Sequence, residues 1–203
     1  MPTDRNGPDR ELRSMLDEAD AALDDEVQAG LQALADCAAT MLPVDGAGLM
    51  LAGPDGVLRS ALASDSVGRL LQTGQERLEA GPSMDAFRCA LPVASSDLRV
   101  DDRWPDLRYL LPKEPLHAAL ATPVTLPDGP VGTLNVWRAT PAGFSLAEIT
   151  AVGRYTRVAA SLLLVSAHAE LRGLLLGRLI RTLAASSPAP DLIGGPGARA
   201  AKR

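Results

Sequence analysis

The residue types that usually carry out chemistry are scarce in this sequence. It contains two His and two Cys, and two each of Trp, Tyr and Phe, among 203 residues. Metal ligands, general bases and nucleophilic thiols are drawn mainly from His and Cys. We therefore expect a protein that is not an enzyme, and the sequence nominates no catalytic residue, no metal ligand and no identifiable cofactor.

The two cysteines also argue against a disulfide scaffold. Cys37 and Cys89 are 52 positions apart and form neither a CxxC pair nor a metal-binding spacing. The first residues are polar and lack the apolar stretch of a signal peptide. Reduced thiols and a cytoplasmic location are the prediction. Only Arg88 lies beside Cys89 to activate it, which favours a buried structural cysteine over a redox thiol.

Long apolar runs and a strong charge of one sign are missing as well. The longest uncharged, largely apolar stretch is 158–169, well short of the ~20 residues that cross a bilayer, so no membrane is expected. Nine of the 25 acidic residues fall within 1–26, and the rest of the chain is nearly neutral. A nearly neutral protein does not attract nucleic acid by its overall charge, although residues 154–203 hold eight basic residues against two acidic ones.

What is present divides the chain into a helical leader, an α+β core and a helical end. Apolar residues recur at steps of three and four over 12–41, as in an amphipathic helix, and Pro43 ends the pattern. The acidic pair at 24–25 and Gly30 leave open whether this is one helix or two. The expected parts are a disordered N-terminus at 1–10, a helical segment at 11–42, a core domain at 43–168, a continuing helix at 169–184 and a disordered tail at 185–203.

Two β-hairpins are expected in the core. Apolar runs at 44–52 and 57–63 flank Gly-Pro-Asp-Gly, and runs at 116–126 and 131–138 flank Pro-Asp-Gly-Pro, which are turn signals between antiparallel strands. The run at 131–138 alternates apolar with polar or small residues, as a half-buried strand does. Between the hairpins we expect a helix with a polar face at 65–80, a short helix at 83–89 and a brief strand at 91–94.

The last helix carries the clearest physical pattern. Ser145 and Glu148 match a capping box at its start, and few breakers occur before Ala184. A coiled-coil-like seam, interrupted by Arg172, consists of Tyr155, Val158, Leu162, Val165, Ala169, Leu176, Leu179 and Leu183. A second apolar stripe lies beside it, and two stripes exceed what one sheet edge can bury. We expect a parallel homodimer in which the terminal helices form a bundle; the alternative is a helix packed wholly within the monomer.

This order of elements, together with several short motifs, resembles a GAF domain. The match covers about 25–168 and is similar to the GAF parts of actinobacterial GAF–ANTAR signalling proteins. It consists of Gly81-Pro82-Ser83-Met84-Asp85-Ala86-Phe87, with Ser83 where that subgroup has Cys, of Arg103-Trp104-Pro105, of Thr122-Pro123-Val124 and of Val131-Gly132-Thr133-Leu134-Asn135-Val136. The resemblance implies a GAF-like central antiparallel sheet flanked by helices. Residues 171–178 look like the opening of an ANTAR module, whose remainder we expect to be truncated or missing.

The resemblance also implies a small-molecule pocket between the sheet and the segments that cross its face at about 81–120. The residues expected to line or gate it are Phe87, Cys89, Trp104, Tyr109, His117 and Trp137. The competing interpretations are structural, with Phe87 and Trp137 in the core and Trp104 anchoring a loop. A haem on His117 is disfavoured because the sequence names no residue that would hold the other ring nitrogen of this histidine, and two unmatched cysteines argue against a GAF-fold methionine sulfoxide reductase.

The leading hypothesis is a non-catalytic sensory and regulatory module of signal transduction. It binds a small molecule or a protein partner and signals through dimeric, coiled-coil terminal helices. The alternative is a nucleic-acid-binding transcription regulator, similar to RNA antiterminators, that uses a degenerate ANTAR-like helix. In that case the basic residues of the last helix would contact phosphates. They are more often a solvated helix end, and nucleic acid is the less favoured partner.

Overall fold

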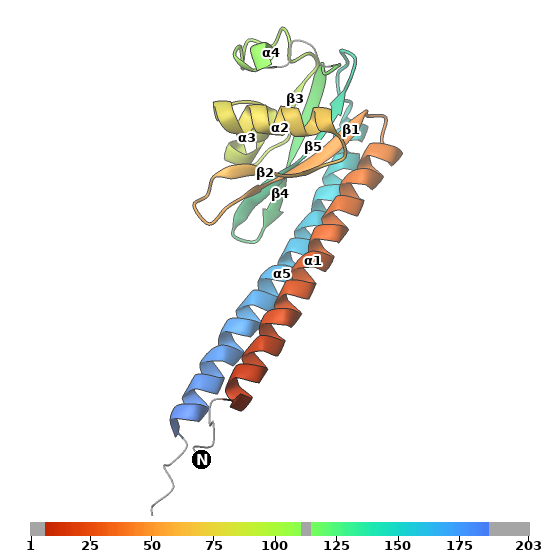
Figure 1. The fold of residues 1–203 in the computed structure, drawn as a ribbon. Helices are drawn as coiled ribbons and strands as arrows, with labels where there is room; N and C mark the ends of the chain where they lie inside the picture. The colour runs from red at the N-terminus through yellow and green to blue at the C-terminus, as the bar shows by residue number, and fades with distance from the viewer. Residues whose placement is uncertain (1–6, 111–114, 187–203) are drawn as a thin grey trace, which may run out of the picture.

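A five-stranded antiparallel sheet forms the centre of the fold (Figure 1). The structure is a computed structural model that describes residues 7–110 and 115–186; for most of 7–23 and for 169–186 it is the backbone that is described. The strands are β1 (Gly46–Ala52), β2 (Leu58–Ala63), β3 (Val93–Ser95), β4 (Ala118–Leu126) and β5 (Gly129–Arg138). Their order across the sheet is β2-β1-β5-β4-β3, so the two hairpins are joined by the non-consecutive pair β1 and β5.

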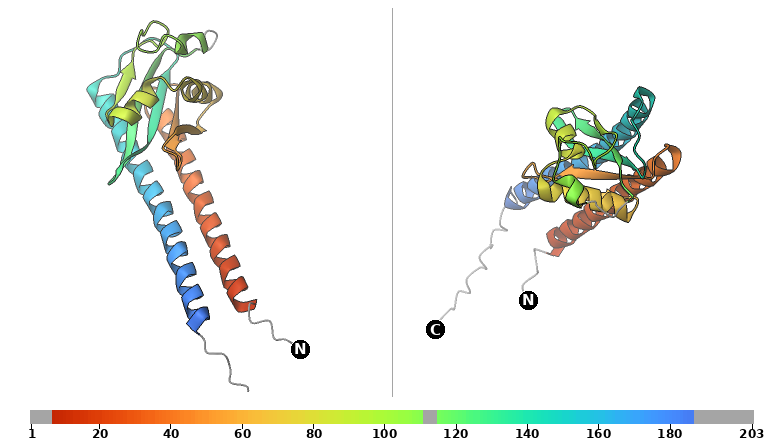
Figure 2. Two further views of the ribbon diagram at one scale, coloured as in Figure 1. Left: turned by 90° about the vertical axis from the view of Figure 1, so that its left-hand side faces the viewer. Right: turned by 90° about the horizontal axis from the view of Figure 1, so that it is seen from above.

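Helices cover both faces of this sheet. On one face lie the two long helices, α1 (Gly7–Met41) and α5 (Leu146–Ser186), which run antiparallel side by side and extend beyond the sheet (Figures 1 and 2). On the other face lie α2 (Ser66–Leu78) and α3 (Pro82–Cys89). The short α4 (Leu107–Leu110) belongs to the connection between β3 and β4. The α+β class and the flanked antiparallel sheet are as predicted.

The local elements follow the sequence signals closely. The expected hairpins form, and Gly56 takes a positive φ of 73° in the first turn, a conformation that glycine adopts without strain. The leader forms one continuous helix rather than two, and it begins at Gly7 rather than near residue 11. Residues 1–6 and 187–203, where disordered ends were predicted, lie outside the described residues.

The main apolar core lies between the sheet and the two long helices. Alternate residues of β1, β4 and β5 point to this face, as Leu49, Leu120 and Leu134 do, and each is at most 1% exposed. Leu31 of α1 and Val152 of α5 pack against them. The sheet therefore holds the domain end of both helices through ordinary hydrophobic burial.

The other face of β5 departs from the prediction of a half-buried strand. Thr133 is 0% exposed and Asn135 is 4% exposed, although alternation with apolar residues suggested that they face water. They are buried because α2 and α3 cover this face as fully as the long helices cover the opposite one. Both faces of β5 are thus buried: its apolar residues face the long helices, and Thr133 and Asn135 face α2 and α3.

The junction between the sheet and the long helices is a hydrogen-bonded cluster around Arg138. Its guanidinium donates to the carbonyl oxygens of Pro43 and Gly143, both at 2.9 Å, and forms an ion pair with Glu148. Glu148 also accepts from the backbone N–H of Ser145 at 2.7 Å, and the Ser145 hydroxyl accepts from the Glu148 N–H at 3.3 Å. The predicted capping box is confirmed, and the Ser145 contacts, together with Arg138, lower the pKa of Glu148.

In the part of the chain that the structure describes, no helix combines the length and the apolar character that crossing a membrane requires.

Candidate functional site

The candidate site is the layer between the sheet and the helices α2 and α3. One side of α2 faces the sheet through residues spaced as on a helix face, namely Gly68, Leu71, Gln72 and Gln75. Opposite them, β1 contributes Gly48, which has no side chain. A Cβ at Gly48 would lie 2.8 Å from the carbonyl oxygen of Leu62 and would overlap the side-chain nitrogen of Gln72. The glycine therefore gives α2 the room to place its glutamines on the sheet.

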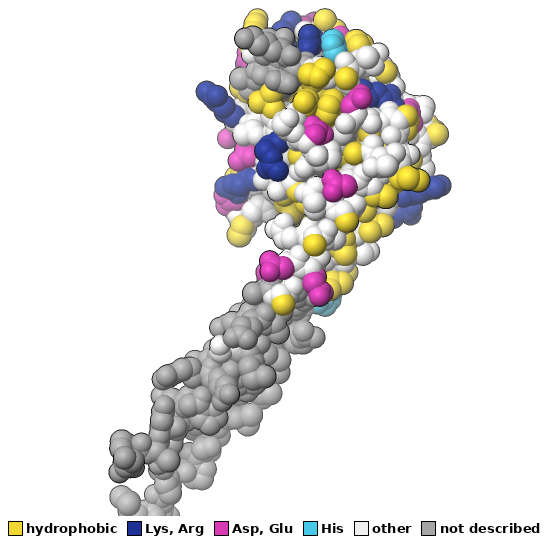
Figure 3. All heavy atoms as spheres, turned by 45° about the vertical axis from the view of Figure 1, so that its right-hand side comes forward, with side chains coloured by type: hydrophobic (Ala, Val, Ile, Leu, Met, Phe, Trp, Pro, Cys, Tyr) yellow, Lys and Arg dark blue, Asp and Glu magenta, His cyan; other side chains and the backbone are white. Residues whose placement is uncertain are grey.

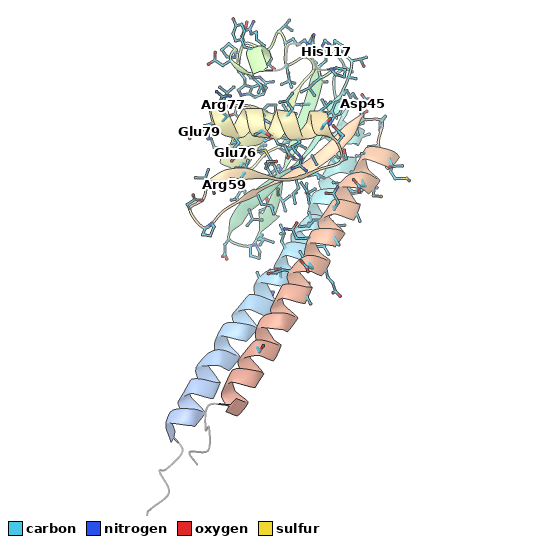
Figure 4. All side chains as sticks on the ribbon, viewed as in Figure 1. Asp45, Arg59, Glu76, Arg77, Glu79 and His117 are labelled. Atoms are coloured by element: carbon cyan, nitrogen blue, oxygen red, sulfur yellow. The ribbon has the colours of Figure 1, made fainter. Side chains whose placement is uncertain are left out.

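Gln72 and Gln75 are both buried, at 1% and 0% exposure. The side-chain nitrogen of Gln72 donates to the carbonyl oxygen of Leu62 at 3.0 Å, and its oxygen accepts from the Ser60 hydroxyl at 2.7 Å. Glu76, one position beyond Gln75, accepts from the backbone N–H of Ser60 at 3.1 Å and lies between α2 and β2 (Figure 4). The polar face predicted for this helix is thus turned partly inward.

Gln75 also fixes the start of α3. Its side-chain oxygen accepts from the backbone N–H of Ser83 at 2.7 Å, which satisfies one of the free donors at the helix N-terminus. Gly81, at φ 135°, makes this contact possible, because a Cβ there would lie 2.5 Å from the Gln75 side chain. The Ser83 hydroxyl in turn donates to the side-chain oxygen of Asn135 on β5 at 2.8 Å. One serine thereby joins α2, α3 and the sheet.

Several polar atoms in this layer have no protein partner. They are the side-chain nitrogens of Gln75 and Asn135, the hydroxyl of Thr133 and the indole nitrogen of Trp137, all fully shielded from solvent. A buried polar group without a hydrogen bond costs roughly 1–3 kcal/mol. This concentration of spare hydrogen-bonding capacity on one face of the sheet is the reason for taking the layer as the candidate site.

Two apolar clusters flank these polar groups. One holds Met50, Leu58 and Met84, with Phe87 packed against it. The other surrounds the two tryptophans and consists of Leu71, Leu98, Trp104, Leu107, Leu116, Ala119 and Trp137. The layer therefore has the composition of a small-molecule site, with a few placed polar groups among apolar walls.

The loop between β3 and α4 is fastened over this face. The Trp104 indole nitrogen donates to the Asp85 carboxylate at 2.8 Å, so two of the motifs singled out in the sequence meet in space. The Arg103 guanidinium lies 4.2 Å from the Trp104 ring centroid and forms a 2.7 Å ion pair with Asp101. Hydrogen bonds from Arg103 and then from Ser95 lower the pKa of Asp101 to about 2.

The residues predicted to line the pocket separate into three groups. Trp104 and Trp137 are buried in this layer and Phe87 is half-buried beside it. Tyr109 is 74% exposed on α4 and does not face the layer. Cys89 is exposed at the end of α3, so the prediction of a buried structural cysteine is wrong; the helix ends there and its last residues turn outward.

His117 lies at the start of β4, away from the polar layer (Figure 4). Its Nδ1 is 3.1 Å from the Asp97 carboxylate, and its backbone pairs with Leu98 and Arg138. Through these contacts His117 helps to hold the loop that contains Asp97 and Leu98. Among the described residues, no three His, Cys, Asp or Glu side chains gather as they would around a metal ion.

Sequence reasoning missed the glutamines and Asn135. Glutamine in a helix ordinarily signals a solvated face, and nothing local shows that a second layer covers it. The available signal was the pair Gly46 and Gly48 in a strand, which the structure places opposite Trp137 and Asn135 of β5, since glycine at such positions indicates close approach of another group.

The predicted helix seam is divided in the structure. Tyr155 and Leu162 are half-buried against α1, and the Tyr155 hydroxyl lies 3.9 Å from the Cys37 sulfur. Val158 and Val165 are 49% and 53% exposed. The side chains of the remaining predicted positions, Ala169, Leu176, Leu179 and Leu183, lie outside the described residues.

Comparison with known proteins identifies the same fold. The sequence profile of the GAF domain family matches residues 26–163. A domain assigned to a two-component sensor histidine kinase from Sinorhizobium meliloti 1021 superposes with a TM-score of 0.59 at 15% identity, covering 71% of this chain and 94% of that one. Among the curated proteins no relative matches the sequence.

Two further structures show how widely the fold is used. A type II free methionine-R-sulfoxide reductase from Thermoplasma acidophilum has a TM-score of 0.55 at 15% identity, covering 69% of this chain and 94% of that one. The blue-light absorbing form of the PixJ GAF domain from Thermosynechococcus elongatus has a TM-score of 0.52 at 17% identity, covering 82% and 98%. At such identities the likeness concerns the fold, which hosts unrelated activities.

Proposed function

The chain belongs to the GAF domain family, and from this premise we propose that it is a non-catalytic, cytoplasmic sensory module that signals through dimeric terminal helices. GAF domains are typically small-molecule-binding regulatory modules, and the layer under α2 and α3 has the composition for that role. The proposal keeps the resemblance of its short motifs to the GAF parts of GAF–ANTAR proteins as a hypothesis. Binding at the layer would act on the helices that cover the opposite face of the same strands.

The observation that carries the proposal is the exposed stripe on α5. Val158 and Val165 are seven residues apart and about half exposed, although the helix already buries another face against α1 and the sheet. A repeat of seven is the spacing that keeps one seam facing a partner helix. A second copy of α5, parallel to the first, would cover these side chains and leave α1 on the outside of a four-helix bundle.

A non-catalytic role is supported by where the cysteines lie. Cys37 is on α1 and Cys89 is at the end of α3, on opposite sides of the sheet. The two thiols therefore do not approach each other as a redox pair would. The group that contacts the Cys37 sulfur is the Tyr155 hydroxyl at 3.9 Å, and the Cys89 sulfur contacts the backbone carbonyl oxygens of Ala86 and Leu91.

Light scattering tests the dimer. For the wild-type chain at micromolar concentration we expect twice the 21.2 kDa of one chain. The double variant Val158→Glu/Val165→Glu should be monomeric, because two charges per helix would be buried in the seam. The matched control is Leu146→Glu, an apolar residue that is 79% exposed at the first position of the same helix and outside the stripe. A monomeric wild type would overturn the proposal.

The alternative of nucleic-acid binding rests on Arg172, Arg178 and Arg181, whose side chains lie outside the described residues. On the face of the domain shown in Figure 3, acidic and basic side chains are interspersed rather than gathered by sign. This face of the domain therefore offers no basic patch of its own to nucleic acid. Salt-dependent binding of mixed RNA that is lost when the three arginines become alanine would favour the alternative instead.

A further inference from the structure

The unpaired amides of the polar layer carry information about the chemistry of the ligand. Gln75 is 0% exposed, and its side-chain oxygen is held by a backbone N–H, that of Ser83. A backbone N–H can only donate, so the orientation of this amide is fixed and the nitrogen must be the spare end. Gln75 therefore presents unpaired buried N–H donors, while its oxygen is already engaged by the Ser83 N–H.

Asn135 complements Gln75 without the same constraint. Its side chain contacts the Ser83 hydroxyl, which can donate or accept, so the two ends of the Asn135 amide can exchange places. In either orientation one end remains without a protein partner. Because both amides attach to the same serine, their spare ends belong to one small region of the layer.

The charge of the layer restricts the ligand further. The buried polar residues here are Gln72, Gln75, Ser83, Thr133 and Asn135, all uncharged, and within the described residues no Arg, Lys or His side chain is classed as buried. A carboxylate or phosphate would have no buried cation to offset its loss of hydration. The spare N–H groups of Gln75 donate, so they select a ligand atom that accepts rather than a cation, although the Glu76 and Asp85 carboxylates lie at the edges of the layer.

From these observations we propose that the layer binds an uncharged compound of the amide or lactam type, whose carbonyl oxygen accepts from the Gln75 side-chain nitrogen and whose polar neighbour pairs with Asn135. The apolar body of the ligand packs against Met50, Met84 and Leu58. This inference rests on the proposed function in that it assigns the ligand of the sensory site. It is independent of whether the helices dimerise.

The probes for the test are three compounds of similar size and different charge: ε-caprolactam, cyclohexanecarboxylate and cyclohexylamine. Binding is followed in the full chain by the NMR signals of the side-chain amides, with Gln75 and Asn135 assigned through bonds. We expect only ε-caprolactam to shift both amides in a saturable way. A dissociation constant of about millimolar is reasonable for so small a fragment.

Gln75→Glu is the informative variant, because it keeps an oxygen for the Ser83 N–H and replaces the donor nitrogen by an acceptor. It should weaken ε-caprolactam binding at least tenfold, roughly the loss of one buried hydrogen bond. Gln28→Glu makes the same change at an exposed position of α1 and should bind as the wild type does. Should Gln75→Glu not fold, the wild-type titration decides alone.

The proposal is overturned if ε-caprolactam leaves the Gln75 amide unshifted, as expected when a buried water alone satisfies it, or if Gln75→Glu binds as well as the wild type. If cyclohexanecarboxylate binds more tightly than ε-caprolactam, the claim that the ligand is uncharged is wrong, although the layer would still be a ligand-binding site. Light scattering on the same samples reports the dimer separately. The failure of this inference can therefore be told apart from the failure of the proposed function.

Discussion

At the scale of single residues, the loop over the candidate site depends on a few polar contacts. Trp104 was open to interpretation as a ligand-stacking residue or a loop anchor, and its hydrogen bond to Asp85 supports the anchor. The sequence placed both residues in family-like motifs, but it could not pair them, because 19 positions separate them and only the fold brings them together.

Asp101 gives this loop a pH dependence. Its pKa is lowered to about 2 from an ordinary value of 3.8, chiefly by the hydrogen bond from Arg103. A lowered pKa means that Asp101 contributes stability above pH 3.8, which is lost as the pH falls toward 2. We expect Asp101→Asn to lower the free energy of unfolding near neutral pH by about 1 kcal/mol at most, because Arg103 is half exposed and water screens the pair.

The measurement is chemical unfolding across this acidic range. The difference between wild type and Asp101→Asn should shrink as the pH approaches 2. Asp102→Asn is the matched control, since the Asp102 side chain is 94% exposed and its change should alter stability little at any pH. A constant difference across the range would show that Asp101 acts through something other than its charge.

At the scale of elements, local signals determined most of what could be predicted. Turn residues, breakers and the Ser145–Glu148 spacing act within a few positions, and the hairpins and the start of α5 follow them. The pairing of β1 with β5 joins segments about 90 residues apart and has no local signal. For the same reason the burial of Thr133 and Asn135 was not predicted, because it depends on which helices cover that face.

The capping box of α5 should make a measurable contribution to the free energy of unfolding. Ser145→Ala removes the hydroxyl that accepts from the Glu148 N–H, and we expect a loss of about 1 kcal/mol in the free energy of unfolding. Ser66→Ala serves as control, because Ser66 is an exposed first-turn serine of α2, whose N-cap is Asp65. Urea denaturation followed by circular dichroism measures both. Equal effects of the two substitutions would argue against the cap.

At the scale of the whole molecule, Arg138 joins parts that would otherwise meet only through apolar packing. It sits at the end of β5 and contacts Pro43 after α1, Gly143 before α5 and Glu148 within α5. Arg138→Met keeps an apolar stem of similar length and removes all of these bonds. We expect it to lower the free energy of unfolding by about 1–2 kcal/mol, since the pair is only half-buried and Glu148 keeps its hydrogen bonds from Ser145 while the two carbonyls lose a donor.

Hydrogen exchange measures whether the loss is local. The amides of Val44 and Asp45 and those within 139–148 should exchange faster in Arg138→Met, while those of β4 keep their protection. Arg59→Met is the control, because the Arg59–Asp55 ion pair is exposed on both sides and its loss should have a far smaller effect. Uniform loss of protection across the sheet would show global destabilisation instead.

Because α5 is long, a small tilt at the Arg138 junction moves its far end by a large distance. The helix has 41 residues, so at 1.5 Å per residue it is about 60 Å long. Its first turn is fixed to the sheet by Arg138, and its far end lies well beyond the domain (Figure 1). A tilt of about 5° at this pivot would swing the tip by about 5 Å, roughly one helical turn. If the proposed signalling runs through α5, a displacement at the sheet that is too small to break its packing would therefore reach the tip enlarged to several ångströms.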